Sequence, residues 1–133
     1  MSKHITKVLP ANVLPEGDSA LIGNINTELN PQGTQIFYLD GRDVCDKRSF
    51  LSKIATVMKF PDYFGHNWDA FDECITDLDW LPAERYVLIY DHPEVFSRAA
   101  PKEWETAYSL LQSAVAYWQS TDKPMDILLI GDQ

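Results

Sequence analysis

Apolar runs along the chain predict three β-strands between residue 34 and the carboxyl terminus. Residues 34–40 combine β-branched and aromatic side chains and end at Gly41, a pattern that is typical of a strand followed by a turn. Residues 85–90 and 126–130 are almost continuous apolar runs, which is expected of strands that are covered on both faces. These three segments form the predicted sheet.

Between the strands, apolar side chains recur at the 3.6-residue spacing of amphipathic helices. The first helix follows Asp46, a good N-cap, and must end before Pro61, which disfavours the helical conformation in the preceding residue. The second helix follows the N-cap candidate Asn67 and continues to about residue 78. A short helical piece precedes Pro101, which suits the first turn of a long third helix.

The element order of strand, helix, helix, strand, helix, strand implies an α/β fold with a mainly parallel sheet. Because the two later strands are too apolar to face water, we expect helices on both faces of this sheet. Residues 1–33 differ, since they hold three prolines and three glycines and only residues 20–25 resemble a strand or a turn of helix. We therefore predict one domain at residues 34–133, preceded by a partly ordered N-terminal extension that packs at the sheet edge.

The composition limits the possible partners. The chain has 133 residues and a net charge of −9, with 20 acidic side chains against 11 basic ones, so it repels nucleic acid and anionic membranes. Apolar side chains make up 45% of the chain, enough for a core, but no apolar run approaches the roughly 20 residues that span a bilayer. The amino terminus leads into no secretory signal, so we expect a soluble, cytoplasmic protein. Cys45 and Cys74 have neither the number nor the spacing of a disulfide framework or a zinc site.

The most acidic and aromatic part of the chain is residues 60–80, which hold six carboxylates and six aromatic rings without a Lys or Arg. Residues three and four apart share a helix face, which places Asp69, Asp72, Glu73 and Thr76 together. Like charges at this spacing repel one another, and the loop just before the helix is rich in the aromatic residues that are enriched in interfaces. A solvated helix face is one interpretation of this pattern, and the docking of a cationic surface is the other.

An enzymatic interpretation is also open. His66, Asp69, Asp72 and Glu73 are a conceivable ligand set for Mg²⁺ or Mn²⁺ in a metal-dependent hydrolase, although their spacing matches no specific motif. The three histidines lie in the tail and in loops, and no Ser or Cys stands in a strand-to-helix nucleophile elbow. Phosphate-binding glycine loops are absent from the sequence. We therefore predict a non-enzymatic protein without a metal site or a cofactor.

Ten positions in the acidic segment resemble the hallmark motif of the barstar family. They are Pro61, Tyr63, Phe64, Gly65, Asn67, Trp68, Asp69, Ala70, Glu73 and Cys74. The run Asp-Leu-Asp-Trp-Leu-Pro that follows and the strand at residues 86–90 also look like the longer family members, so the resemblance covers roughly residues 35–132. It implies a three-stranded parallel sheet surrounded by helices, and an intracellular protein that inhibits a small secreted ribonuclease.

The resemblance also implies how such an inhibitor acts: the acidic helix and the loop before it block the basic active site of the ribonuclease by mimicking phosphate. By this analogy Asp69 pairs with Arg and His groups of the enzyme, and Glu73 takes the position of a substrate phosphate. The predicted partner-binding residues are Tyr63, Phe64, Gly65, His66, Asn67, Trp68, Asp69, Asp72, Glu73 and Thr76.

Three departures from the family pattern bear on the identity of the partner. Asp72 stands in place of a Trp, and Glu73 in place of an Asp extends the carboxylate by one methylene. The second acidic contact of the family falls near Ala116 or Gln119, neither of which is acidic. We expect a monomer when free, whose partner is a basic secreted-type ribonuclease or another cationic nuclease. The alternative is an interaction or immunity module of the same fold that binds a different protein.

Overall fold

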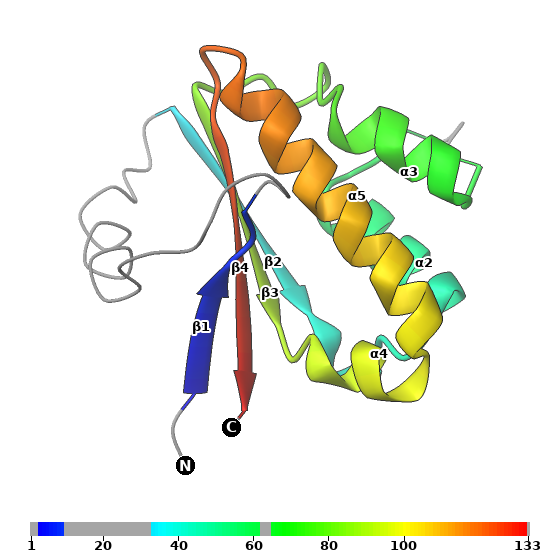
Figure 1. Cartoon of the computed structure of the whole chain (residues 1–133). Helices are drawn as coiled ribbons and strands as arrows, with labels where there is room; N and C mark the ends of the chain where they lie inside the picture. The colour runs from blue at the N-terminus through cyan, green and yellow to red at the C-terminus, as the bar shows by residue number, and fades with distance from the viewer. Residues whose placement is uncertain (1–2, 10–32, 62–64, 133) are drawn as a thin grey trace.

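The computed structural model of the chain describes residues 3–9, 33–61 and 65–132. Its strands form one sheet in the order β1-β4-β3-β2 (Figure 1). The bounds are Lys3–Lys7 for β1, Thr34–Asp40 for β2, Arg85–Asp91 for β3 and Met125–Asp132 for β4. Strands β2, β3 and β4 run parallel, whereas β1 pairs with β4 in antiparallel orientation. The prediction of a three-stranded parallel sheet is therefore wrong, because the described residues form a mixed sheet of four strands.

Strand β1 forms one edge of the sheet. Ile5 pairs with Ile130 of β4, and just beyond the strand the Val8 amide donates to the Ile127 carbonyl at 2.8 Å. Val8 is fully buried in the core. The sequence did not predict this strand, because its five residues include one apolar side chain among four polar ones and its formation depends on pairing with β4. The element predicted at residues 20–25 lies outside the described residues.

The described residues also include four α-helices: α2 (Lys47–Val57), α3 (Trp68–Ile75), α4 (Glu94–Ala99) and α5 (Pro101–Gln119). Asp46 and Asn67 are the N-caps of α2 and α3, and Pro101 lies in the first turn of α5, as predicted. Helix α3 ends before the expected residue 78, because Thr76 is its C-cap and Leu78 has a left-handed φ of 53°. Among all the residues that the structure describes, no helix has both the length and the apolar character needed to cross a membrane.

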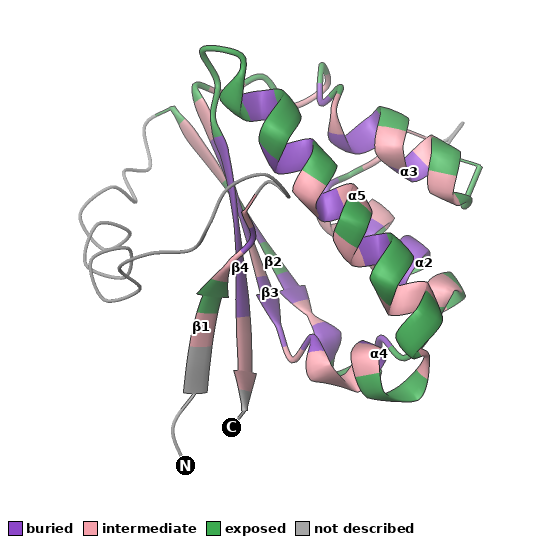
Figure 2. Cartoon of the chain, viewed as in Figure 1, coloured by how far each residue is buried: buried purple, intermediate pink, exposed green. Residues whose placement is uncertain are grey.

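All four helices lie on one face of the sheet (Figure 1). The sheet is largely buried along the strands that the helices cover (Figure 2). The strand residues that belong to the hydrophobic core are Phe37, Leu39, Tyr86, Leu88, Tyr90, Met125, Ile127 and Leu129. On the opposite face Ile36 and Tyr38 are 41% and 53% exposed, although Val87 is buried there. The prediction of helices on both faces is therefore wrong for the described residues. An apolar run in a strand indicates burial, but it does not identify the element that provides it.

Phe50 of α2 is the centre of the packing around α3. Its ring lies 5.3 Å from Phe71 and 6.1 Å from Trp68, both of α3. It also lies 6.1 Å from Tyr90 of β3 and 5.6 Å from Phe96 of α4. Phe50 is fully buried, and its ring contacts join α2, α3, α4 and strand β3 in one aromatic cluster. This cluster determines where α3 lies on the domain.

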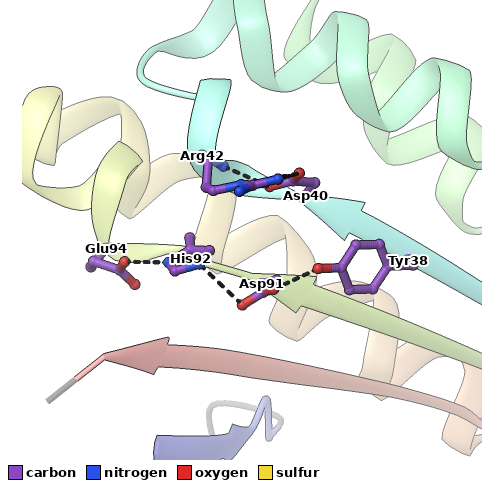
Figure 3. A network of polar contacts seen from close by, with 6 residues as sticks. All are labelled: Tyr38, Asp40, Arg42, Asp91, His92 and Glu94. Atoms are coloured by element: carbon purple, nitrogen blue, oxygen red, sulfur yellow. Dashed lines mark hydrogen bonds and ion pairs between the residues drawn. The ribbon is translucent and has the colours of Figure 1, made fainter. Parts of the chain in front are cut away.

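A polar network lies at the carboxyl ends of β2 and β3 (Figure 3). It contains the side-chain pairs Tyr38–Asp91, His92–Glu94 and Arg42–Asp40. The Tyr38 hydroxyl donates to Asp91 Oδ2 at 2.5 Å, and this hydrogen bond raises the pKa of Tyr38. His92 Nδ1 lies 3.0 Å from Glu94 Oε2, which links the end of β3 to the start of α4. These contacts connect neighbouring elements of the sheet and are part of the architecture.

Candidate functional site

Helix α3 starts from a loop whose geometry Asn67 fixes. The Ala70 amide donates to Asn67 Oδ1 at 2.8 Å, which satisfies one of the free donors in the first helical turn. Asn67 Nδ2 donates to the Gly65 carbonyl at 3.4 Å, so the same side chain also holds the loop. His66 has a left-handed φ of 54°, an uncommon conformation for a residue with a Cβ atom. The N-cap predicted from the sequence is confirmed, and it fixes the direction in which α3 leaves the loop.

The inner face of α3 is anchored in the core. Phe71, Cys74 and Ile75 are buried, as the helical spacing predicts. The Phe71 ring meets Phe50 edge-on at 5.3 Å, and the indole N–H of Trp118 in α5 donates to the Ile75 carbonyl at 2.9 Å. Burial raises the pKa of the Cys74 thiol, which disfavours the reactive thiolate, so this cysteine contributes to packing. These contacts hold α3 firmly against α2 and α5.

The outer face of α3 carries an acidic ridge of Asp69, Asp72 and Glu73. Asp69 and Glu73 are exposed, whereas Asp72 is half-buried. Asp69 and Glu73 are four residues apart, about 6 Å along the helix axis, so both lie on the same face. In the part of the chain that the structure describes, none of these three carboxylates forms an ion pair. Their charge is therefore available to a partner.

Two of the predicted contact residues also take part in the fold. The Thr76 hydroxyl donates to the Asp72 carbonyl at 2.8 Å, and the Thr76 amide donates to the same carbonyl at 3.3 Å, so Thr76 closes the end of α3. Trp68 is half-buried, with its ring 6.1 Å from Phe50 and the Lys47 ammonium 5.6 Å from its centre. Each of these side chains therefore has a structural role, and its contact with a partner stays a prediction.

The loop before α3 is exposed where the structure describes it. Gly65, His66 and Asn67 are all exposed, whereas the predicted contacts Tyr63 and Phe64 lie outside the described residues. His66 lines two hollows of the surface, one of about 490 Å³ along the end of α2 and one of about 260 Å³ beside its start. The loop therefore stands at the border of two depressions that a docking protein can fill.

A third hollow, of about 290 Å³, lies beyond the other end of α3 and was not predicted. Among its lining residues are Thr76, Asp77 and Asp79 after α3, Tyr117 and Trp118 of α5, and Lys123. The acidic run that continues past Thr76 to Asp79 was a signal in the sequence, but no local pattern indicates that Tyr117 lies beside it. Ala116 and Gln119, near which the family places its second acidic contact, are exposed on α5 and do not line the hollow.

From the sequence, four side chains are possible ligands of Mg²⁺ or Mn²⁺, and the structure shows how these side chains are arranged. Within the described ranges, no group of three or more His, Cys, Asp or Glu side chains is arranged to hold a metal ion. His66, Asp69, Asp72 and Glu73 are all described residues, and they do not form such a group.

A family model, Barstar (barnase inhibitor), matches residues 34–130 of the chain. The chain belongs to the barstar family. The match confirms the resemblance carried by the motif before and within α3, and it spans every described element except β1 and the end of β4. A search of the curated proteins gives no match.

Membership of the barstar family indicates which kind of partner the chain has. The family is one of inhibitors, and its name specifies barnase as a target, so a ribonuclease is the kind of partner that the family implies. The loop and α3 lie inside the matched residues, whereas β1 is an addition outside them.

Proposed function

We propose that this chain inhibits a basic ribonuclease by inserting α3 and the loop before it into the active site of the enzyme. The observation that carries the proposal is the position of Asp69 and Glu73. Both carboxylates are exposed and lie one helical turn apart on a helix whose opposite face is buried. Such a helix presents two negative charges at a fixed spacing to whatever docks on it.

The chemistry of a ribonuclease active site explains why carboxylates would block it. Such a site binds phosphate through clustered Arg, Lys and His side chains, and these groups donate equally well to a carboxylate. The N-cap hydrogen bond of Asn67 and the buried contacts of Phe71 keep α3 ordered before binding. Association with a preorganised helix loses less conformational entropy, which strengthens binding. The net charge of −9 would also steer a cationic enzyme toward the inhibitor.

Asp72 and Glu73 would adapt this site to a particular target. Glu73 reaches further than an Asp would, which suits an enzyme with a deeper phosphate pocket. Asp72 adds a third, half-buried charge where the family has an aromatic ring. The same departures support the alternative, a module of the same fold that binds a different cationic protein. Cytoplasmic location and a monomeric free state stay predictions.

Inhibition of barnase by single alanine variants tests the proposal. We expect Asp69→Ala and Glu73→Ala each to weaken inhibition by more than about 100-fold, because each leaves a cationic group of the enzyme buried without its partner. Asp122→Ala removes the same charge from an exposed position after α5 and should change inhibition by less than about twofold. Equal effects of all three variants would show that net charge, and not α3, governs the interaction.

Salt dependence and a panel of basic ribonucleases separate the two candidate functions. Association with a ribonuclease should slow steeply as salt is raised from about 50 mM to about 500 mM, because screening weakens the steering between exposed charges. If no ribonuclease in the panel is inhibited, while a different cationic protein binds in a manner that Asp69→Ala abolishes, the alternative replaces the proposed function.

A further inference from the structure

The hollow beyond α3, which we name the α3–α5 cavity, has the dimensions of a site for one side chain. Its volume of about 290 Å³ is at or below the lower end of the range for small-ligand pockets, about 300–1,000 Å³. Its lining residues come mainly from the segment that follows α3 and from the end of α5. Thr76, the C-cap of α3, is one of its lining residues. The cavity therefore begins at the end of the helix that carries the acidic ridge.

One wall of the α3–α5 cavity is aromatic. Tyr117 is 47% exposed, one of three large apolar side chains that the described surface leaves exposed. Its ring stands at 87° to that of Trp118, with 5.1 Å between the ring centres. Trp118 is itself held by the hydrogen bond from its indole N–H to the Ile75 carbonyl. Tyr117 therefore offers a ring whose orientation is supported by the core.

The cavity lining includes two carboxylates, Asp77 and Asp79, that have no partner within the described residues. Asp77 and Asp79 are exposed on either side of the buried Leu78, and neither side chain has an ion pair or a hydrogen bond there. Lys123 is the one cation among the described lining residues. Its ammonium is carried on a flexible, exposed stem and can turn into water without breaking a contact.

From this combination of cavity, ring and charge, we infer that the α3–α5 cavity receives an arginine side chain of the same ribonuclease that α3 inhibits. A planar guanidinium can stack on the ring of Tyr117 while its N–H groups donate to Asp77 or Asp79. A lysine ammonium can also lie over a ring, but it is a compact charge without the flat surface that stacks on the ring while its N–H groups reach two spaced acceptors. Arginine is also enriched among the residues that dominate protein interfaces.

This inference rests on the proposed function and extends it along the surface. Ala116 and Gln119 leave α5 without the acidic side chain that the family pattern has there. The α3–α5 cavity supplies negative charge to the same part of the molecule from the segment after α3. The inhibitor would then hold its target at two points, with the acidic ridge in the active site and the cavity around an arginine beside it.

Matched variants of the full chain test the inference against barnase. Tyr117→Leu keeps an apolar side chain but removes the ring, and Asp77→Asn and Asp79→Asn remove one charge each. We expect Tyr117→Leu and the double variant Asp77→Asn/Asp79→Asn each to weaken inhibition by about threefold to thirtyfold. Asp122→Asn lies outside the cavity lining and should change inhibition by less than about twofold. Circular dichroism of each variant verifies that the fold is intact.

A second measurement tests, in the absence of the enzyme, whether the cavity binds a guanidinium group. L-argininamide is titrated into the full chain while the indole N–H signal of Trp118, which lines the cavity, is followed by NMR. We expect a saturable shift at millimolar ligand that lysinamide does not reproduce and that Tyr117→Leu abolishes.

The outcomes distinguish failure of the inference from failure of the proposed function. If the cavity variants affect barnase no more than Asp122→Asn, while Asp69→Ala still abolishes inhibition, the inference is overturned and the function stands. If the wild-type chain does not inhibit barnase, the proposed function fails for that enzyme, and the L-argininamide titration alone decides whether the cavity accepts a guanidinium. A shift that does not saturate, or that lysinamide reproduces, overturns the inference in that case.

Discussion

Single residues that cap helices fix the local geometry on which the site depends. Asp46 caps α2 through a reciprocal box, in which the Ser49 amide donates to Asp46 Oδ1 at 2.9 Å and the Asp46 amide donates to Ser49 Oγ at 3.1 Å. Asn67 does the same for α3 with one hydrogen bond, from the Ala70 amide. The two caps differ in one respect: a carboxylate can be protonated, whereas an amide cannot.

The Asp46 cap predicts a pH dependence of stability. The hydrogen bond from the Ser49 amide lowers the pKa of Asp46 below its ordinary value of 3.8. A carboxyl whose pKa is lowered by folding stabilises the native state above its unfolded pKa, and this contribution is lost as the pH falls through the folded value. Asp46→Asn, which keeps an N-cap without a titrating group, should therefore lose less stability than the wild type below pH 3.8.

Urea denaturation at about pH 7 and at about pH 3 measures this effect. At about pH 7 the midpoints of the wild type and Asp46→Asn should be close, and the difference between the two pH values should be smaller for the variant. Asp122→Asn, an exposed aspartate that caps no helix, should respond to acid as the wild type does. An identical response of all three proteins would contradict the role of the cap.

At the scale of elements, the packing of α3 explains why its acidic face is presented rigidly. The helix has eight residues, too few to be stable alone, so tertiary contacts supply its order. Those contacts converge on Phe50, whose ring meets Phe71 and Trp68 of α3 as well as residues of β3 and α4. The position of the acidic ridge therefore depends on a residue of another helix.

Truncation of Phe50 should unfold the domain more easily and loosen α3. Because Phe50 is fully buried, Phe50→Ala is expected to reduce the free energy of unfolding by about 3–5 kcal/mol. Phe50→Leu retains more of the side-chain volume and should cost less. Urea denaturation gives both values, and a loss below about 1 kcal/mol for Phe50→Ala would contradict the central role assigned to this ring.

At the scale of the whole molecule, β1 and α3 occupy opposite sides of the domain (Figure 1). Strand β1 covers the outer edge of β4, and Val8 just after it inserts a fully buried side chain into the same core that supports the helices. The described residues before the family match thus belong to the folded unit. Strand β1 itself lies away from α3 in Figure 1, although Leu9 just after it accepts a hydrogen bond from Gln112 of α5 at 3.1 Å.

This separation predicts that stability and inhibition respond differently to a change at Val8. Val8→Ala should reduce the free energy of unfolding by about 2 kcal/mol, because it removes buried apolar volume. Inhibition of barnase, measured well below the denaturation midpoint, should stay within about twofold of the wild type. Thr6→Ala, at an exposed position of β1, is the matched control and should change neither quantity appreciably. A marked loss of inhibition by Val8→Ala would instead place β1 near the binding surface.

Features of this protein that depend on residues a few positions apart could be predicted from the sequence. Strands β2, β3 and β4, the caps at Asp46 and Asn67, and the two faces of α3 all follow from the order of neighbouring residues. The same holds for the acidic ridge, because positions three and four apart meet on a helix whatever else the chain does. The family motif consists of neighbouring residues between Pro61 and Cys74, so the resemblance could be recognised from the sequence without the fold.

Only the tertiary structure decided the features that depend on contact between distant segments. A strand with a single apolar residue forms at β1 because β4 offers it an open edge, and helices cover one face of the sheet because the crossovers all pass on that side. Trp68 is partly a core residue because Phe50 lies beneath it. Tyr117 lines the same hollow as Asp77 and Asp79 because α5 packs beside α3. Long-range packing fixes these positions, and local preference carries no information about it.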